Sequence, residues 1–199
     1  MTADKNILVL GIGNILWADE GFGVRAVEEF HKRYEIPKNV ILMDGGTQGL
    51  YLVQFVQEAD RLLVFDAVDY GLDPGEMIVV HDEEVPKFTG AKKMSLHQTG
   101  FQEVLSAADF TGYYPSHLTM IGVQALDLED WGNSLTDLVK TKMDDAMDLA
   151  VEQLEKWGVV VSLRTTPLPD DEGLLGHSLD IGCYETGFPM RRSDATGGA

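Results

Sequence analysis

The feature of the sequence that most constrains the fold is the stretch from Ile7 to Asn14, which consists of Ile-Leu-Val-Leu-Gly-Ile-Gly-Asn. A run of four apolar residues, ended by Gly-x-Gly and followed by a helical pattern, is typical of a buried parallel strand that enters a tight turn. Two acidic residues, Asp19 and Glu20, then stand at the start of the expected helix. In an open α/β sheet, ligands bind at this edge.

Short apolar runs and helical patterns alternate along the chain as far as Trp157. Further strands are predicted over 40–43, 61–65, 76–81 and 118–123. Helices are predicted directly after the first turn, over 50–56, from Ser95 onwards, and as one long helix over 135–157, with a loop over 87–94. We therefore predict an α/β fold of three layers, with a twisted, mostly parallel five-stranded sheet and helices on both faces.

The composition changes at Arg164, where a Pro-rich and then Gly-rich stretch without a sustained period begins. We predict a single α/β domain over residues 1–163 and a C-terminal extension over residues 164–199. Several apolar residues between Leu174 and Phe188 are too many for a wholly solvated tail. We therefore expect part of the extension to be disordered and part to dock on this chain or on a partner.

The net charge of −18 and the pI near 4.4 disfavour binding to nucleic acid or to an anionic membrane. The single cysteine, Cys183, excludes an internal disulfide framework and a Cys-based zinc cluster. No stretch approaches the roughly 20 apolar residues that cross a bilayer, and Met1–Lys5 is too short for the charged part of a signal peptide. We expect a cytoplasmic monomer without membrane insertion.

One interpretation of the first turn is a dinucleotide site, because Gly11 and Gly13 follow a strand and Asp44 ends the next one. The third glycine of G-x-G-x-x-G would fall at Leu16, however, and two acids follow where a pyrophosphate would bind. Charge repulsion disfavours this interpretation.

A second interpretation is a metal or catalytic cluster made of Glu20, Asp66 and His97, with Asp44 nearby. Loops after parallel strands share one edge of a sheet, so these residues can converge there. Two carboxylates and an imidazole suit a divalent first-row ion, and the cation would remove the repulsion between the carboxylates. Each residue also has an ordinary alternative: a first-turn acid for Glu20, a cap for Asp66, a turn residue for Asp44 and a helix-start polar group for His97.

Four blocks of sequence together carry a resemblance to a known family. They are Gly11–Leu16 with Asp19–Val24, Asp44–Gly49, Asp66–Ala67 and Ser95–Gln98. The chain resembles, from about Ile7 to about Trp157, the maturation endopeptidases that process the large subunit of nickel-iron hydrogenases. The forms of the second and fourth blocks are most similar to the branch that serves membrane-bound uptake hydrogenases.

The resemblance implies an aspartic-type or metal-dependent endopeptidase that removes the C-terminal peptide from the nickel-loaded precursor of the large subunit. It also implies that Glu20, Asp66 and His97 are ligands of a nickel ion supplied by the substrate, and that Asp44 joins them in the catalytic site. A rival from another class is a non-catalytic nickel checkpoint or chaperone protein that binds the same precursor with the same cluster.

Overall fold

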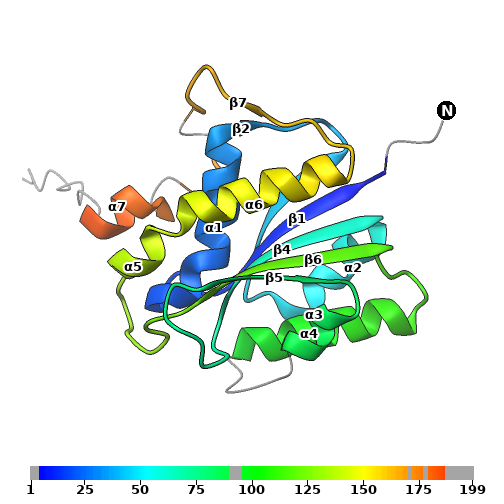
Figure 1. The fold of residues 1–199 in the computed structure, drawn as a ribbon, viewed down its shortest axis with the longest axis horizontal. Helices are drawn as coiled ribbons and strands as arrows, with labels where there is room; N and C mark the ends of the chain where they lie inside the picture. Colours follow the sequence, from blue (N-terminus) through cyan, green and yellow to red (C-terminus); the bar gives the residue numbers. More distant parts are fainter. Residues whose placement is uncertain (1–4, 90–95, 170–171, 177–178, 187–199) are drawn as a thin grey trace, which may run out of the picture.

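A computed structural model of the chain has a five-stranded sheet at its centre (Figure 1). It describes residues 5–89, 96–169, 172–176 and 179–186, and their side chains except those of residues 87–89 and 96–99. The strands of this sheet are β1 (Ile7–Ile12), β3 (Val40–Gly46), β4 (Arg61–Val68), β5 (Met77–His81) and β6 (His117–Gln124). Their order is β3-β1-β4-β6-β5, and only β5, at one border, is antiparallel to its neighbour. The predicted fold class is confirmed.

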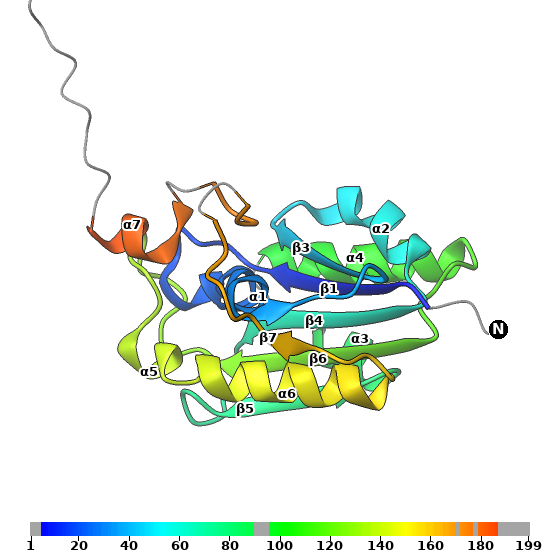
Figure 2. The same cartoon turned by 90° about the horizontal axis from the view of Figure 1, so that it is seen from above.

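Helices cover both faces of the sheet (Figures 1 and 2). They are η1 (Ala18–Gly21), α1 (Phe22–Arg33), η2 (Gly49–Leu52), α2 (Val53–Glu58), α3 (Glu84–Thr89), α4 (Leu96–Phe110), α5 (Asp137–Lys140), α6 (Met143–Lys156) and α7 (Ile181–Thr186). Helices α1, α5 and α6 contribute to one hydrophobic core, and α2 and α4 to a second core on the opposite face. The molecule therefore has three layers, with the sheet between two cores.

The residues of each strand alternate between these two cores. In β1, Ile7 and Val9 belong to the core on the α1 side, whereas Leu8 and Leu10 belong to the core on the α4 side. Successive side chains of a strand point to opposite faces, so this alternation assigns a face to every position, polar ones included. The carboxyl ends of β1, β3, β4 and β6 meet at one edge, and the loops that follow them emerge there.

The long helix predicted over 135–157 is wrong in one respect, because the structure has two helices, α5 and α6, in its place. The Thr141 hydroxyl donates a hydrogen bond of 2.6 Å to the carbonyl of Leu138. Such side-chain bonds to the preceding turn compete with regular helix continuation. Leu138 of α5 is 38% exposed and covers Gly75 in the turn before β5.

The loop predicted over 87–94 is partly helical, since α3 extends to Thr89. A helix of six residues is too short to reveal a period in the sequence, and it is anchored by the fully buried Val85. Residues 90–95 lie outside the described part, including Ser95, where this helix is predicted to begin. Helix α4 follows as predicted, with Phe101 buried.

The chain after α6 returns to α1. The two-residue strand β7 (Ser162–Leu163) pairs with β2 (Tyr34–Glu35), directly after the end of α1. The described part of the extension then runs along α1 and ends in α7, beside α5 (Figure 2). None of the helices in the described ranges has the length and apolar character that crossing a bilayer requires.

Candidate active site

The turn after β1 is shaped by Gly13, whose φ of +134° is unfavourable for any residue with a side chain. A Cβ atom at Gly13 would lie 1.9 Å from the carbonyl oxygen of Glu20. The same oxygen accepts a hydrogen bond of 3.1 Å from the backbone N–H of Asn14. The loop therefore closes on itself and fixes η1, with the half-buried Glu20, at the end of β1. The space beside Gly13 that a pyrophosphate would need is filled by this backbone.

Asp66 lies within β4, opposite Gly122 of β6, and its side chain is fully buried. It alternates with Phe65 and Ala67 of the α1-side core, so it shares the α4 face with Val64 and Val68. Helix η1 packs against β4, which brings the segment of Glu20 to that of Asp66. At the start of α1, a Cβ on Gly23 would lie 2.2 Å from the carbonyl oxygens of both Ile12 and Phe65, so only glycine allows this close approach.

Asp44 lies within β3, opposite Gly11 of β1, and not after the strand as predicted. Val40 and Leu42 of the same strand pack in the α1-side core and Met43 packs against the other, so Asp44 is on the α1 face. Asp44 and Asp66 thus belong to opposite faces of the sheet. Asp44 was expected near the other three residues, and this separation between the two faces was not predicted.

Burial raises the pKa of the Asp44 carboxyl, while a hydrogen bond from the Gly46 backbone and the positive charge of Arg25 lower it. The net result is a pKa above the ordinary value. Its Oδ1 atom is buried and has no hydrogen-bond partner among the described residues. Ionising a carboxyl group in this setting costs free energy and lowers the stability of the fold. A buried polar group of this kind is a candidate functional residue.

His97 lies in the first turn of α4, and its side chain is outside the described part of the structure. One turn later, a Cβ on Gly100 would lie 3.6 Å from the Cα atom of Gly49. The start of α4 therefore adjoins the loop that follows Asp44. The backbone of all four predicted site residues reaches the carboxyl edge of the sheet, and the convergence of their side chains stays a prediction.

Asp19 is a further residue of this edge, and the sequence analysis gave it no role. It is fully buried. Its Oδ2 atom accepts hydrogen bonds of 3.0 Å from the backbone N–H groups of Leu126 and Asp127, and Oδ1 accepts one of 2.7 Å from Thr136. Asp19 therefore ties the loop after β1 to the loop after β6. The sequence does not indicate which of the two adjacent acids, Asp19 or Glu20, points inward.

The loop after β6 is also held by an aromatic pair, Trp17 and Trp131, whose ring centroids are 5.2 Å apart in an edge-to-face arrangement. The backbone N–H of Gly132 donates a hydrogen bond of 2.8 Å to the carbonyl of Leu16. These contacts fix the loop after β6 against the turn after β1.

No group of three His, Cys, Asp or Glu side chains suitable for a metal is found among the described residues, a set that leaves out the His97 side chain. A cavity lined by Asp82, Gln102, Tyr114 and His117, among others, lies at the opposite edge, where β6 begins. It contains none of the predicted site residues.

Comparisons with known proteins first show the general class of protein to which this chain belongs. The family model described as "Hydrogenase maturation protease" matches residues 24–153, which is more than half of the chain, so the fold is that of a peptidase. The E. coli structure described as a hydrogenase maturating endopeptidase, HybD, superposes with a TM-score of 0.77 and 40% sequence identity, and it covers 80% of this chain and 98% of that chain.

Curated relatives give the particular family. A hydrogenase expression/formation protein, HupD, of Bradyrhizobium diazoefficiens is 64% identical over 92% of this chain and 95% of its own length. HoxM of Cupriavidus necator is 50% identical over 94% and 93%, and the hydrogenase 2 maturation protease of Escherichia coli K12 is 43% identical over 77% and 93%. The chain belongs to the hydrogenase maturation protease family. The predicted family is confirmed, and a peptidase is favoured over a non-catalytic checkpoint protein.

Proposed function

We propose that this protein is an endopeptidase that cuts one peptide bond near the C-terminus of the nickel-loaded precursor of a nickel-iron hydrogenase large subunit. Membership of the maturation protease family supports the reaction class. The observation that carries the location of the site is the packing of η1 on β4, which brings the segments of Glu20 and Asp66 together at the carboxyl edge. The product is the mature large subunit with a short peptide released.

In this proposal, nickel enters as part of the substrate, and Glu20, Asp66 and His97 hold it. Two carboxylates and an imidazole are a suitable donor set for a divalent first-row ion. Asp66 is fully buried, and a carboxylate in such a place gains most from a cation. Recognition of the metal would make cleavage conditional on its prior insertion into the precursor.

The chemical step is hydrolysis. The oxygen of a water molecule bonds to the scissile carbonyl carbon, the C–N bond breaks, and the leaving amine takes up a proton. By gripping the metal of the substrate, Glu20, Asp66 and His97 hold the peptide bond at the edge, where a metal ion can polarise the carbonyl or lower the pKa of the water.

The subtype that we favour is metal-dependent rather than aspartic. An aspartic-type dyad needs two carboxyl groups close enough to share one proton. The strand alternation that separates Asp44 from Asp66 weighs against such a dyad. We assign Asp44 the role of orienting the loop over 44–49, which adjoins the start of α4. We further propose that the protein acts as a cytoplasmic monomer and serves a membrane-bound uptake hydrogenase.

The test is a comparison of two histidine variants on purified, nickel-loaded precursor, with the loss of peptide mass as readout. His97→Gln should lower the cleavage rate on the order of a hundredfold, because a ligand of the substrate metal is lost. The matched control is His117→Gln, an exposed histidine at the other edge of the sheet, which should cleave normally. Normal cleavage by His97→Gln would remove the proposed site, and no cleavage by the unaltered protein would support the checkpoint alternative.

A further inference from the structure

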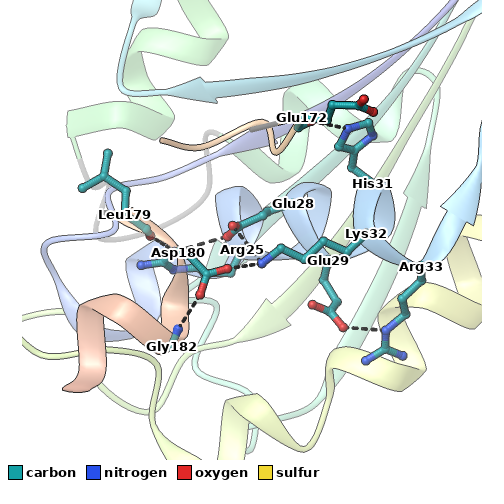
Figure 3. Close-up of polar contacts among 10 residues, drawn as sticks. All are labelled: Arg25, Glu28, Glu29, His31, Lys32, Arg33, Glu172, Leu179, Asp180 and Gly182. Carbon is teal, nitrogen blue, oxygen red and sulfur yellow. Dashed lines mark hydrogen bonds and ion pairs between the residues drawn. The ribbon is translucent and has the colours of Figure 1, made fainter. Parts of the chain in front are cut away.

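The described part of the C-terminal extension contacts α1 at several points between its end and Arg25 (Figure 3). The backbone N–H of Arg164 donates a hydrogen bond of 2.7 Å to the carbonyl of Arg33, at the end of α1. Further on, the carbonyl of Glu172 lies 3.0 Å from Nε2 of His31. The segment then reaches Lys32 through Asp180, with which it forms an ion pair. These three contacts all lie in the last turn of α1, at residues 31–33.

The last contacts of the extension surround Arg25, near the start of α1. Arg25 is only 4% exposed, and its Nη1 atom donates hydrogen bonds to the Glu28 carboxylate, at 3.2 Å, and to the carbonyl of Leu179 (Figure 3). The guanidinium also lies over the ring of Tyr184, 5.5 Å from its centroid. A buried guanidinium needs acceptors on several sides, and here the extension supplies some of them.

The extension is anchored on both sides of Arg25 by further ion pairs. Lys32 contacts both Asp180 and Glu28, at 3.0 Å for the latter. Lys140 of α5 contacts Glu185 of α7 at 2.6 Å. The Lys32 ammonium holds the pKa of Asp180 below its usual value, so the pair is charged on both sides at neutral pH. Helix α7 is thereby fixed between α1 and α5.

Arg25 is also the charged neighbour of Asp44 on the α1 face of the sheet. Helix α1 packs against β3, and the positive charge of Arg25 acts on the Asp44 carboxyl. Among the described residues, the groups that act on Asp44 are Arg25 and the Gly46 backbone N–H, and those that act on Arg25 include Glu28 and Glu185. Arg25 is therefore the side chain that links the extension to Asp44.

We propose that residues 179–186 position Arg25, and through it Asp44 and the loop after β3, so that the extension is a working part of the protease. The proposal rests on the proposed function. Arg25 acts as a positioning residue, because it brings a positive charge to Asp44 across the contact between α1 and β3 and does not meet the reacting atoms. The loop over 44–49 transmits the effect to the start of α4, where it adjoins Gly100. The E. coli HybD structure matches only 80% of this chain, so the device belongs to long forms such as this one.

The first experiment removes the segment by ending the chain after Gly176, and it measures kcat and KM for cleavage of nickel-loaded precursor. A positioning role predicts a kcat that falls about tenfold with KM within about twofold, the pattern for an interaction needed mainly in the transition state. A raised KM with unchanged kcat would instead make the segment a docking site for the precursor and would overturn the proposal. Unchanged kcat and KM would overturn it as well.

A second set of variants guards against simple unfolding of the truncated chain. Lys32→Asp and Asp180→Lys should each lower kcat, and the double variant, which restores the pair with reversed charges, should recover most of it. The matched control is Arg33→Gln, the next residue of α1, whose side chain pairs with Glu29 and Asp144 and faces away from the extension. It should leave kcat unchanged. Failure of the double variant to recover activity would contradict the positioning role.

A third measurement does not depend on activity. Carbon NMR titration of the Asp44 carboxyl in the purified full-length protein should show its pKa moving upward in Arg25→Gln and Tyr184→Leu, because the positive charge is lost or displaced. Arg33→Gln should leave it in place. A stationary Asp44 pKa in both variants would overturn the inference while leaving the proposed function standing, whereas inactivity of the unaltered protein would overturn the function alone.

Discussion

Asp44 combines a buried carboxyl, a raised pKa and the nearby positive charge of Arg25, and this combination has a consequence for stability. A carboxyl whose pKa is higher in the folded state binds protons more tightly there than in the unfolded chain. The folded protein therefore loses stability as the pH rises through the interval between the two pKa values. The loss is absent below the unfolded pKa of about 4 and is complete once the pH exceeds the folded-state pKa.

Asp44→Asn should therefore raise the melting temperature at pH 7 by a few degrees, and this gain should vanish near pH 3.5. The same variant should cleave precursor more slowly, because the amide does not reproduce the charged partner of Arg25. Thermal unfolding at the two pH values, together with the cleavage rate, checks both parts. A variant that is less stable at pH 7 than at pH 3.5, relative to the unaltered protein, would contradict the assigned environment.

Asp19 is the second residue whose role follows from its hydrogen bonds. In Asp19→Asn, the amide nitrogen would face backbone donors of the loop after β6, whichever way the side chain is turned. The expected loss is about 3 kcal/mol of unfolding free energy, because charge-assisted bonds to several buried donors are lost. This corresponds to a decrease of roughly 6 to 12 °C in melting temperature.

The matched control for Asp19 is Glu129→Gln, an exposed acid in the same loop, which should change the melting temperature by less than about 2 °C. Equal effects of the two substitutions would mean that the loop after β6 is not held by Asp19.

At the scale of elements, the junction between β1 and α1 depends on the close approach of two backbones. Gly13→Ala would place a methyl group 1.9 Å from the Glu20 carbonyl oxygen, in addition to the strain of a positive φ. Gly112→Ala is a matched control, because it has a φ of +77° and open space around it. The control should cost about 1 kcal/mol, and Gly13→Ala about 3 kcal/mol or more.

The two glycine variants should differ in activity more than in fold. Gly13→Ala forces η1 away from the end of β1 and moves Glu20, so cleavage should be lost even where circular dichroism shows a native helix content. Gly112→Ala lies at the far end of α4 and should cleave normally. Normal cleavage by Gly13→Ala would show that the position of Glu20 is not important.

At the scale of the whole molecule, the sheet and its layers were predictable because periodicity reports burial directly. The apolar run of Ile7–Leu10 and the stripe of α1 each required one buried face, and the order of helices and strands then left an α/β fold. The break between α5 and α6 was not predictable, because the sequence does not show that the Thr141 hydroxyl bonds to the Leu138 carbonyl.

The membership of the site stays a prediction, and its geometry was not predictable. Glu20, Asp44, Asp66 and His97 were proposed from strand exits and from the family blocks, which identify positions along the chain. Strand boundaries decide which face a residue occupies, and a sequence fixes these boundaries only loosely. Arg25 and Asp19 were missed as partners because each is held by residues more than 100 positions away.

The distance along the chain between Arg25 and Leu179, 154 residues, also sets an order in time. At a translation rate of about 5 to 20 residues per second, α1 emerges from the ribosome roughly 8 to 30 s before the segment that completes its polar contacts. During this interval, Arg25 has Glu28 as a partner but lacks Leu179 and Tyr184. A newly made chain can thus form the sheet before Leu179 and Tyr184 are available to complete the contacts of Arg25. The surroundings of Asp44 are therefore among the last parts of the fold to be completed.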